Sequence, residues 1–136
     1  MYCLTHTVAG GMTAGRLGHP VAAFFGGVIS HLILDAVPHH DYKRIVLGVF
    51  DILLALGCLV FALWRPGFFP PAFAWGGLGG ALPDLELVLH YLPGKDRRRF
   101  FPSHSGLIPH NRLAWPAGFW VQVAVVLAVS GLWYFF

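Results

Sequence analysis

Runs of apolar residues, separated by short polar stretches, make up most of this chain. A helix needs about 20 apolar residues to cross the hydrocarbon core of a membrane. Four runs reach or approach that length, at residues 21–37, 45–64, 72–92 and 113–136. The pattern therefore predicts an all-α fold, an integral membrane helical bundle with four transmembrane helices.

A fifth apolar segment, residues 4–15, is shorter and rich in glycine and alanine. At about 1.5 Å per residue it is too short for a full crossing, so we expect a short N-terminal helix that packs against the bundle. Small residues let helix backbones approach closely in a membrane. Proline, which cannot continue a helix, lies near the ends of the segments, at Pro38, Pro66, Pro70, Pro71 and Pro93.

The composition supports a lipid environment. Hydrophobic residues make up 57% of the 136 positions and charged residues only 11%, against about 45–50% and about 25% in soluble domains. A chain of this length has room for one domain, residues 1–136. The net charge of +3 is too small and too local to indicate a nucleic-acid partner.

The positive charges gather at one end of the predicted helices. If the helices alternate in direction, one face carries seven of the nine Lys and Arg residues and the opposite face carries Arg16 and Arg65. The richer face holds Lys43, Arg44, Lys95, Arg97, Arg98, Arg99 and Arg112. An excess of Lys and Arg marks the cytoplasmic ends of membrane helices, so this face is predicted to be cytoplasmic.

Most of the chemically versatile side chains fall on the same face. The topology rests on Lys and Arg alone, so this placement is a separate observation. Of the eight histidines, only His19 belongs to the opposite face. The others are His6, His31, His39, His40, His90, His104 and His110, and they are joined by Asp35, Asp41, Asp84 and Glu86.

Two pairs of these residues have helical spacing. His31 and Asp35 are four residues apart, as are Glu86 and His90, so each pair shares one face of a helix. An isolated His–Asp pair is more often a plain hydrogen-bonded pair than a metal site. Here several carboxylates and imidazoles lie at the ends of apolar helices, where ionisable groups are costly, and a shared cation such as Zn²⁺ would offset that cost. Asp51, alone within its run, is expected to be a helix-packing or network residue rather than a ligand.

Four short segments resemble the family of inner-membrane, predicted metal-dependent hydrolases that are often labelled YdjM-like. They are Thr5-His6-Thr7, Ser30-His31-Leu32-Ile33-Leu34-Asp35, Pro83-Asp84-Leu85-Glu86 and Ser103-His104-Ser105. Their order along the chain differs from that of the family. The resemblance implies a metal-dependent hydrolase in the cytoplasmic (inner) membrane of a bacterium or archaeon.

Residues and resemblance together lead to one functional hypothesis. The chain is predicted to be a membrane-bound hydrolase that acts on a lipid-like phosphoester at the cytoplasmic face, with one or two Zn²⁺ ions, or Mn²⁺ instead. The metal ligands are predicted among His6, His31, Asp35, His39, His40, Asp84, His104 and His110. Glu86 or Asp41 is the predicted general base, and Arg97, Arg98, Arg99 and Arg112 are the predicted phosphate-binding residues.

Two alternatives stay open. The chain could be a transporter of metal or other ions, which requires polar residues at successive depths, and the sequence offers chiefly Asp51, Gln122 and Ser130. It could also be a non-enzymatic membrane protein with a structural metal site. Membrane lipids are the expected partners in each case, and a bundle of this size is compatible with a homodimer.

Overall fold

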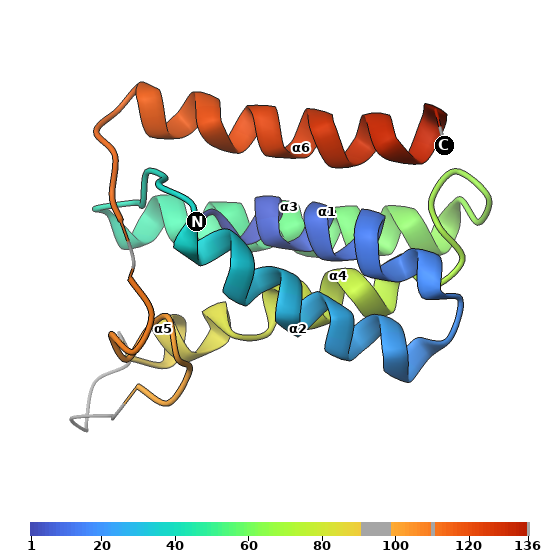
Figure 1. Ribbon diagram of the computed structural model, residues 1–136, viewed down its shortest axis with the longest axis horizontal. Helices are drawn as coiled ribbons and strands as arrows, with labels where there is room; N and C mark the ends of the chain where they lie inside the picture. Colours follow the sequence, from blue (N-terminus) through green and yellow to red (C-terminus); the bar gives the residue numbers. More distant parts are fainter. Residues whose placement is uncertain (91–98, 110, 136) are drawn as a thin grey trace.

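The computed structural model of the chain describes residues 1–90, 99–109 and 111–135, with only the backbone of His90. These residues form helices and turns and no β-strand (Figure 1), which confirms the all-α prediction for this part of the chain. The helices are α1 (Cys3–Ala14), α2 (Pro20–Ala36), α3 (Ile45–Trp64), α4 (Phe73–Ala81), α5 (Asp84–His90) and α6 (Ala117–Phe135), with a 3₁₀ turn, η1 (Gly15–Leu17), after α1.

Two helices, α3 and α6, are long and apolar enough to cross a membrane. The apolar helix α2 has 17 residues and is shorter. The predicted span 72–92 is divided into α4 and α5, since Pro83, at the break between them, has no N–H to continue the hydrogen bonds of a helix. Of the four predicted transmembrane helices, two therefore meet the length and hydropathy required of a single crossing helix.

The short helix α1 lies at the centre of the bundle, where the sequence predicted a helix packed against it. It contacts α2, α3, α4 and α6, and Figure 1 shows it between them. Small residues allow this position. A Cβ atom on Gly10 or Gly27 would collide with the carbonyl oxygen of Gly76, and one on Gly80 with that of His6. The contacts of α1, α2 and α4 are therefore backbone against backbone.

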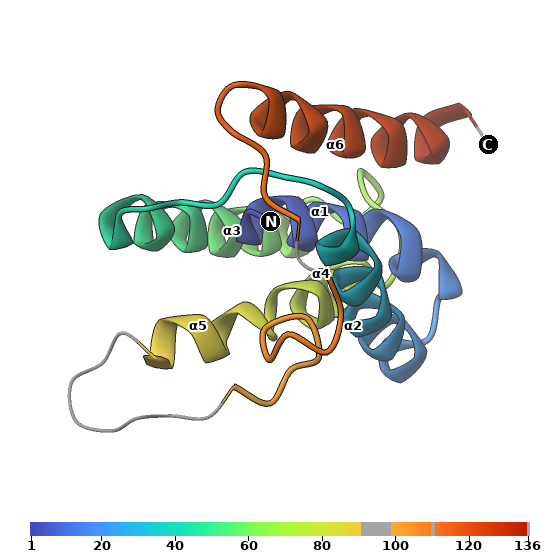
Figure 2. The ribbon, with the colours of Figure 1, turned by 60° about the vertical axis from the view of Figure 1, so that its left-hand side comes forward.

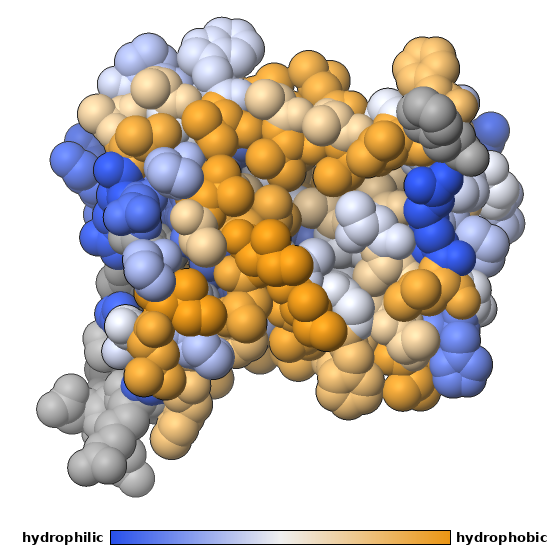
Figure 3. Space-filling view, in the orientation of Figure 1, coloured by the Kyte–Doolittle hydropathy of each residue, from blue (hydrophilic) through white to orange (hydrophobic). Residues whose placement is uncertain are grey.

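Large apolar side chains cover the outer surface of the molecule. Only 17% of the most apolar stretch of α3 and 11% of that of α6 is buried, whereas the core helices of soluble proteins are mostly buried. The space-filling view shows an apolar band across the middle, with polar residues on its two sides (Figure 3). This distribution is the one expected of helices that meet lipid.

The alternation of helix direction brings distant segments to one end of the bundle. The start of α1, the end of α2, the start of α3, helix α5 and the segment before α6 all lie at this end (Figures 1 and 2). The turn at Arg16 and the loop at Arg65 lie at the opposite end. The predicted site residues of the described chain therefore share one end of the molecule.

Candidate metal centre

His31, near the end of α2, has one ring nitrogen fixed by the protein. Its Nδ1 lies 2.6 Å from the carbonyl oxygen of Gly80 in α4. A carbonyl can only accept, so Nδ1 carries a proton, and in this tautomer of an imidazole the lone pair lies at Nε2. The side chain is fully buried. Its Nε2 lies 3.2 Å from Oδ2 of Asp35, but it makes no hydrogen bond to the described residues.

His6, on the central helix α1, is oriented in the same way. Its ring stacks on that of His31 with centroids 3.7 Å apart. Its Nε2 lies 3.1 Å from Oδ1 of Asp35 and donates to that carboxylate. The proton on Nε2 leaves a lone pair on Nδ1, and this buried atom has no partner within the described part of the chain.

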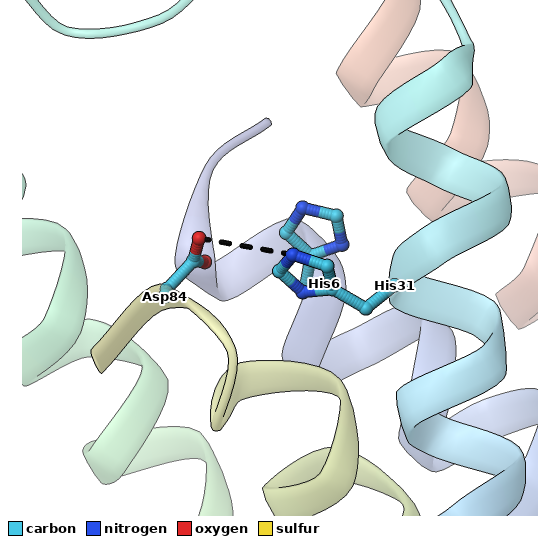
Figure 4. A group of neighbouring side chains, drawn as sticks. All are labelled: His6, His31 and Asp84. Carbon is cyan, nitrogen blue, oxygen red and sulfur yellow. Dashed lines mark ion pairs between the residues drawn. The ribbon is translucent and has the colours of Figure 1, made fainter. Parts of the chain in front are cut away.

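Asp84, the first residue of α5, faces the two imidazoles (Figure 4). Its Oδ1 lies 4.0 Å from Nε2 of His31. Its Oδ2 is buried and, like the two ring nitrogens, unpaired in the described structure. One ligand atom from each of the three residues lies within 4.8 Å of the others. Electron-pair donors converge here, and a cation that they can share would satisfy all three.

Asp35 and His104 extend this cluster. His31, Asp35 and His104 form a second group whose ligand atoms lie within 4.8 Å of one another. Nε2 of His104 is 3.6 Å from Asp35 and 3.8 Å from Asp84. The hydroxyl of Ser103 donates to Asp35 at 2.6 Å. The name metal centre is used below for His6, His31, Asp35, Asp84 and His104, a group that can hold a metal ion.

Glu86 holds His104 in place. One carboxylate oxygen lies 3.1 Å from Nδ1 of His104, and the backbone N–H groups of Phe100 and Phe101 donate to the same carboxylate. Burial lowers the pKa of His104, but the interactions with Asp35 and Glu86 outweigh burial and raise that pKa above its ordinary value. With Nδ1–H directed at Glu86, the imidazole can offer Nε2 to an ion, as second-shell acceptors commonly arrange.

The predicted residues just after α2 form a different cluster. Nδ1 of His39 donates to the carbonyl of Val37 at 2.6 Å, and its Nε2 faces Asp41 at 3.1 Å. Asp41 also accepts from Nε of Arg112 at 3.0 Å. His40 bonds through Nδ1 to the hydroxyl of Tyr2 at 2.9 Å. Neither histidine belongs to the two groups of metal-ligating atoms found among the described residues.

Gln122 of α6 joins this cluster to the N-terminal residues. Its amide group donates to the carbonyl of His40 at 2.9 Å, and its carbonyl accepts from the backbone N–H of Tyr2 at 2.7 Å. The name turn network is used below for His39, His40, Asp41, Arg112 and Gln122. In the network, the protein itself supplies hydrogen-bond partners.

Asp51 serves helix packing, as the sequence predicted. Although it lies on the apolar helix α3, it accepts hydrogen bonds from the backbone N–H groups of Cys3 and Leu4, at 2.6 and 3.2 Å. These N–H groups open α1 and have no partner within the helix. The carboxylate therefore caps α1 from a neighbouring helix.

A cavity of about 500 Å³ adjoins the metal centre. Asp84, Ser103 and His104 line one part of it, and Asp41 lines it as well. Three arginines also contribute, Arg44, Arg99 and Arg112. Two of these were predicted to bind phosphate. The predicted residues Arg97, Arg98 and His110 lie outside the described residues.

Sequence reasoning missed three residues that the structure places at this end. Arg44, directly before α3, was assigned only a topological role. Ser103 was noted only as a neighbour of His104, yet it bonds Asp35. Gln122, a single polar residue within an apolar run, was considered only for an ion path; its isolation was the sign of a buried partner.

No known protein family, curated protein or solved structure matches this chain.

Proposed function

We propose that this protein is a membrane-bound, metal-dependent hydrolase that acts on a phosphoester. The observation that carries the proposal is the group of His6, His31 and Asp84, in which one ligand atom from each residue lies within 4.8 Å of the others and each residue has a buried side-chain atom without a hydrogen-bond partner in the described structure. An unsatisfied buried polar group costs about 1–3 kcal/mol, and three in one place indicate a site that a ligand completes. The ligand that two imidazoles and a carboxylate suit best is Zn²⁺, with Mn²⁺ as the alternative.

The five residues of the metal centre would hold one or two ions. His6, His31 and Asp84 offer the unpaired atoms, and Asp35 and His104 stand beside them. When bound, such an ion supplies Lewis-acid assistance to phosphoester hydrolysis. Gly80, Asp35 and Glu86 each hold one ring nitrogen of His31, His6 and His104, respectively, which would leave the other ring nitrogen available to an ion.

The remaining chemistry falls to residues along the cavity. Arginine is well suited to hold a phosphate, and Arg44, Arg99 and Arg112 line the cavity. In the hydrolysis, the oxygen of water bonds to phosphorus and the bond from phosphorus to the ester oxygen breaks. Asp41 takes a proton from the attacking water and returns it to the departing oxygen, which leaves as an alcohol. Glu86 accepts three N–H groups and, unlike Asp41, does not line the cavity, so it is better placed as a positioning residue than as a base.

The membrane setting of the proposal extends beyond the two candidate crossing helices. We propose that α2 and the α4–α5 pair also traverse the bilayer, which gives four crossings around the central α1. Of the six Lys and Arg residues that the structure describes, four lie at the end that carries the metal centre, namely Lys43, Arg44, Arg99 and Arg112. By the positive-inside rule, it would face the cytoplasm of a bacterial or archaeal cell.

The test uses the full chain, purified in detergent, stripped with a chelator and reloaded with Zn²⁺ or Mn²⁺. We expect near-stoichiometric metal by elemental analysis and hydrolysis of p-nitrophenyl phosphate or its diester. Asp84→Asn should lose both, whereas His19→Ala, at an exposed histidine of the opposite end, should keep both. Wild-type protein that takes up neither metal would overturn the proposal. Metal without hydrolysis would assign the centre a structural role.

A further inference from the structure

The cavity beside the metal centre has two unlike parts. Charged groups occupy one part, where Arg44, Arg99 and Arg112 line it together with Asp84 and His104. The other part is mostly apolar and is built by two helices, with Ile45, Gly48, Val49 and Ile52 from α3 and Leu87 and Val88 from α5. Asp51 of α3 also lines the cavity, but its carboxylate is engaged by the N–H groups that open α1. The volume of about 500 Å³ lies within the range of pockets that enclose small organic ligands.

The apolar part is a helical groove. Positions 45, 48, 49 and 52 follow the spacing of one helix face, as do positions 84, 87 and 88. These two faces are turned toward the cavity, and in the described structure α3 and α5 scarcely touch each other (Figure 2). From Ile45 to Ile52 the wall runs for about 10 Å along α3, at 1.5 Å per residue.

This wall continues onto the lipid-facing side of the molecule. Ile45 and Val49 line the cavity, yet 51% and 48% of their surfaces are exposed. They belong to α3, the most apolar of the candidate crossing helices. An apolar chain that lies in the membrane beside α3 can therefore reach the cavity without passing through water.

We propose that this cavity takes a lipid phosphate, which enters sideways from the membrane between α3 and α5. The inference rests on the proposed hydrolase function and specifies its substrate class as a phosphomonoester with an acyl chain. The phosphate lies among Arg44, Arg99 and Arg112, next to the metal centre. The first carbons of the chain lie against Gly48, Ile52 and Val88. A water-soluble phosphoester uses the charged part alone.

Gly48 gives a direct test. Gly48 lines the cavity and a Cβ atom there meets no other atom within 4 Å, so Gly48→Leu adds bulk at the cavity wall from a position with open surroundings. Gly57 lies on the same helix, has equally open surroundings and does not line the cavity. Gly57→Leu is therefore the matched control. Val88→Trp narrows the cavity from the α5 side and serves as a second, independent variant.

The readouts are binding and turnover. Native mass spectrometry of the protein in nanodiscs measures phosphatidic acid retained relative to phosphatidylcholine. The zinc-loaded protein is assayed on phosphatidic acid in mixed micelles and on p-nitrophenyl phosphate. For Gly48→Leu and Val88→Trp we expect at least a fivefold loss of bound phosphatidic acid and at least a tenfold loss of its hydrolysis. Hydrolysis of p-nitrophenyl phosphate should change less than about twofold, and Gly57→Leu should match the wild type throughout.

Each other outcome is decisive. Equal binding in Gly48→Leu, Val88→Trp and wild type overturns the lateral entry, as does an equal loss of lipid and soluble activity. A third outcome separates the two proposals. If neither substrate is hydrolysed, but the wild type retains phosphatidic acid and Gly48→Leu does not, the lipid site is supported and the hydrolase function is overturned. If p-nitrophenyl phosphate is hydrolysed but phosphatidic acid is neither retained nor hydrolysed, the hydrolase function stands and the lipid site falls.

Discussion

In the metal centre, His6, His31 and Asp84 each carry a buried atom without a hydrogen-bond partner among the described residues. In the turn network, at the same end of the bundle, the histidines bond to partners within the chain, His39 to Val37 and His40 to Tyr2. The residue types are alike in the two regions. They differ in whether a buried side-chain atom is left without a partner in the described structure, and that difference separates the candidate metal ligands from the histidines of the turn network.

The largest expected effect is on metal binding by single histidines. His31→Ala removes an unpaired nitrogen and an imidazole that Gly80 orients, so we expect Zn²⁺ affinity to fall by more than about 100-fold, beyond the 10–100-fold typical of outer-shell partners. His39→Ala and His40→Ala should keep the wild-type affinity. Isothermal titration calorimetry with Zn²⁺, on protein stripped of metal, measures the affinity of all three variants. Equal losses in His31→Ala and His39→Ala would erase the distinction between the two regions.

The next effect concerns the residue that orients His104. Glu86→Gln keeps the shape of the side chain but removes the charge that holds Nδ1–H of His104 and the N–H groups of Phe100 and Phe101. We expect Zn²⁺ affinity to fall by about 10-fold to 100-fold, with unchanged stoichiometry. The same titration provides the measurement. A loss of stoichiometry would make Glu86 a direct ligand, and no change would remove its positioning role.

Much of the helical arrangement could be predicted from the sequence, because the apolar runs and the i, i+4 spacings depend only on neighbouring residues of the chain. The apolar run 45–64 coincides with α3. The i, i+4 spacing of His31 and Asp35 brings Nε2 of His31 to 3.2 Å from Oδ2 of Asp35. The topology also gathered the described site residues at one end. These features depend on helix geometry and on the alternation of helix direction, and both can be read along the chain.

Other features depend on three-dimensional packing and could not be predicted. Glycines in three segments let α1 become the central helix, and this brings His6 onto the ring of His31. From the sequence alone, the histidines of the predicted cytoplasmic face could not be divided into metal ligands and structural residues. Only the fold shows that His40 bonds to Tyr2, whereas His6 keeps an unpaired nitrogen.

Two buried carboxylates sharpen the comparison in terms of stability. Asp51 and Asp84 both lie on apolar helices and are 4% and 8% exposed. Asp51 accepts two N–H groups that open α1, so Asp51→Ala should lower the free energy of unfolding by about 1–2 kcal/mol, the usual effect of losing a helix cap. Thermal unfolding in detergent, followed by circular dichroism with chelator present, measures it. Unfolding unchanged from the wild type would show that α1 needs no cap from α3.

The smallest expected effect is that of Asp84→Asn in the same metal-free experiment. Asp84 has an unpaired Oδ2, and the nearest histidine nitrogens lie at 3.8 Å or more from its Oδ1. Asp84→Asn removes a buried charge whose contacts with the histidines are this long, so the free energy of unfolding should change by less than about 1 kcal/mol. With Zn²⁺ added, the wild type should gain stability, by about 2.7 kcal/mol at 100 times the dissociation constant, and Asp84→Asn should gain little. If Asp84→Asn loses as much as Asp51→Ala without metal, then Asp84 stabilises the fold by itself. An equal gain with Zn²⁺ in both proteins would place the ion elsewhere.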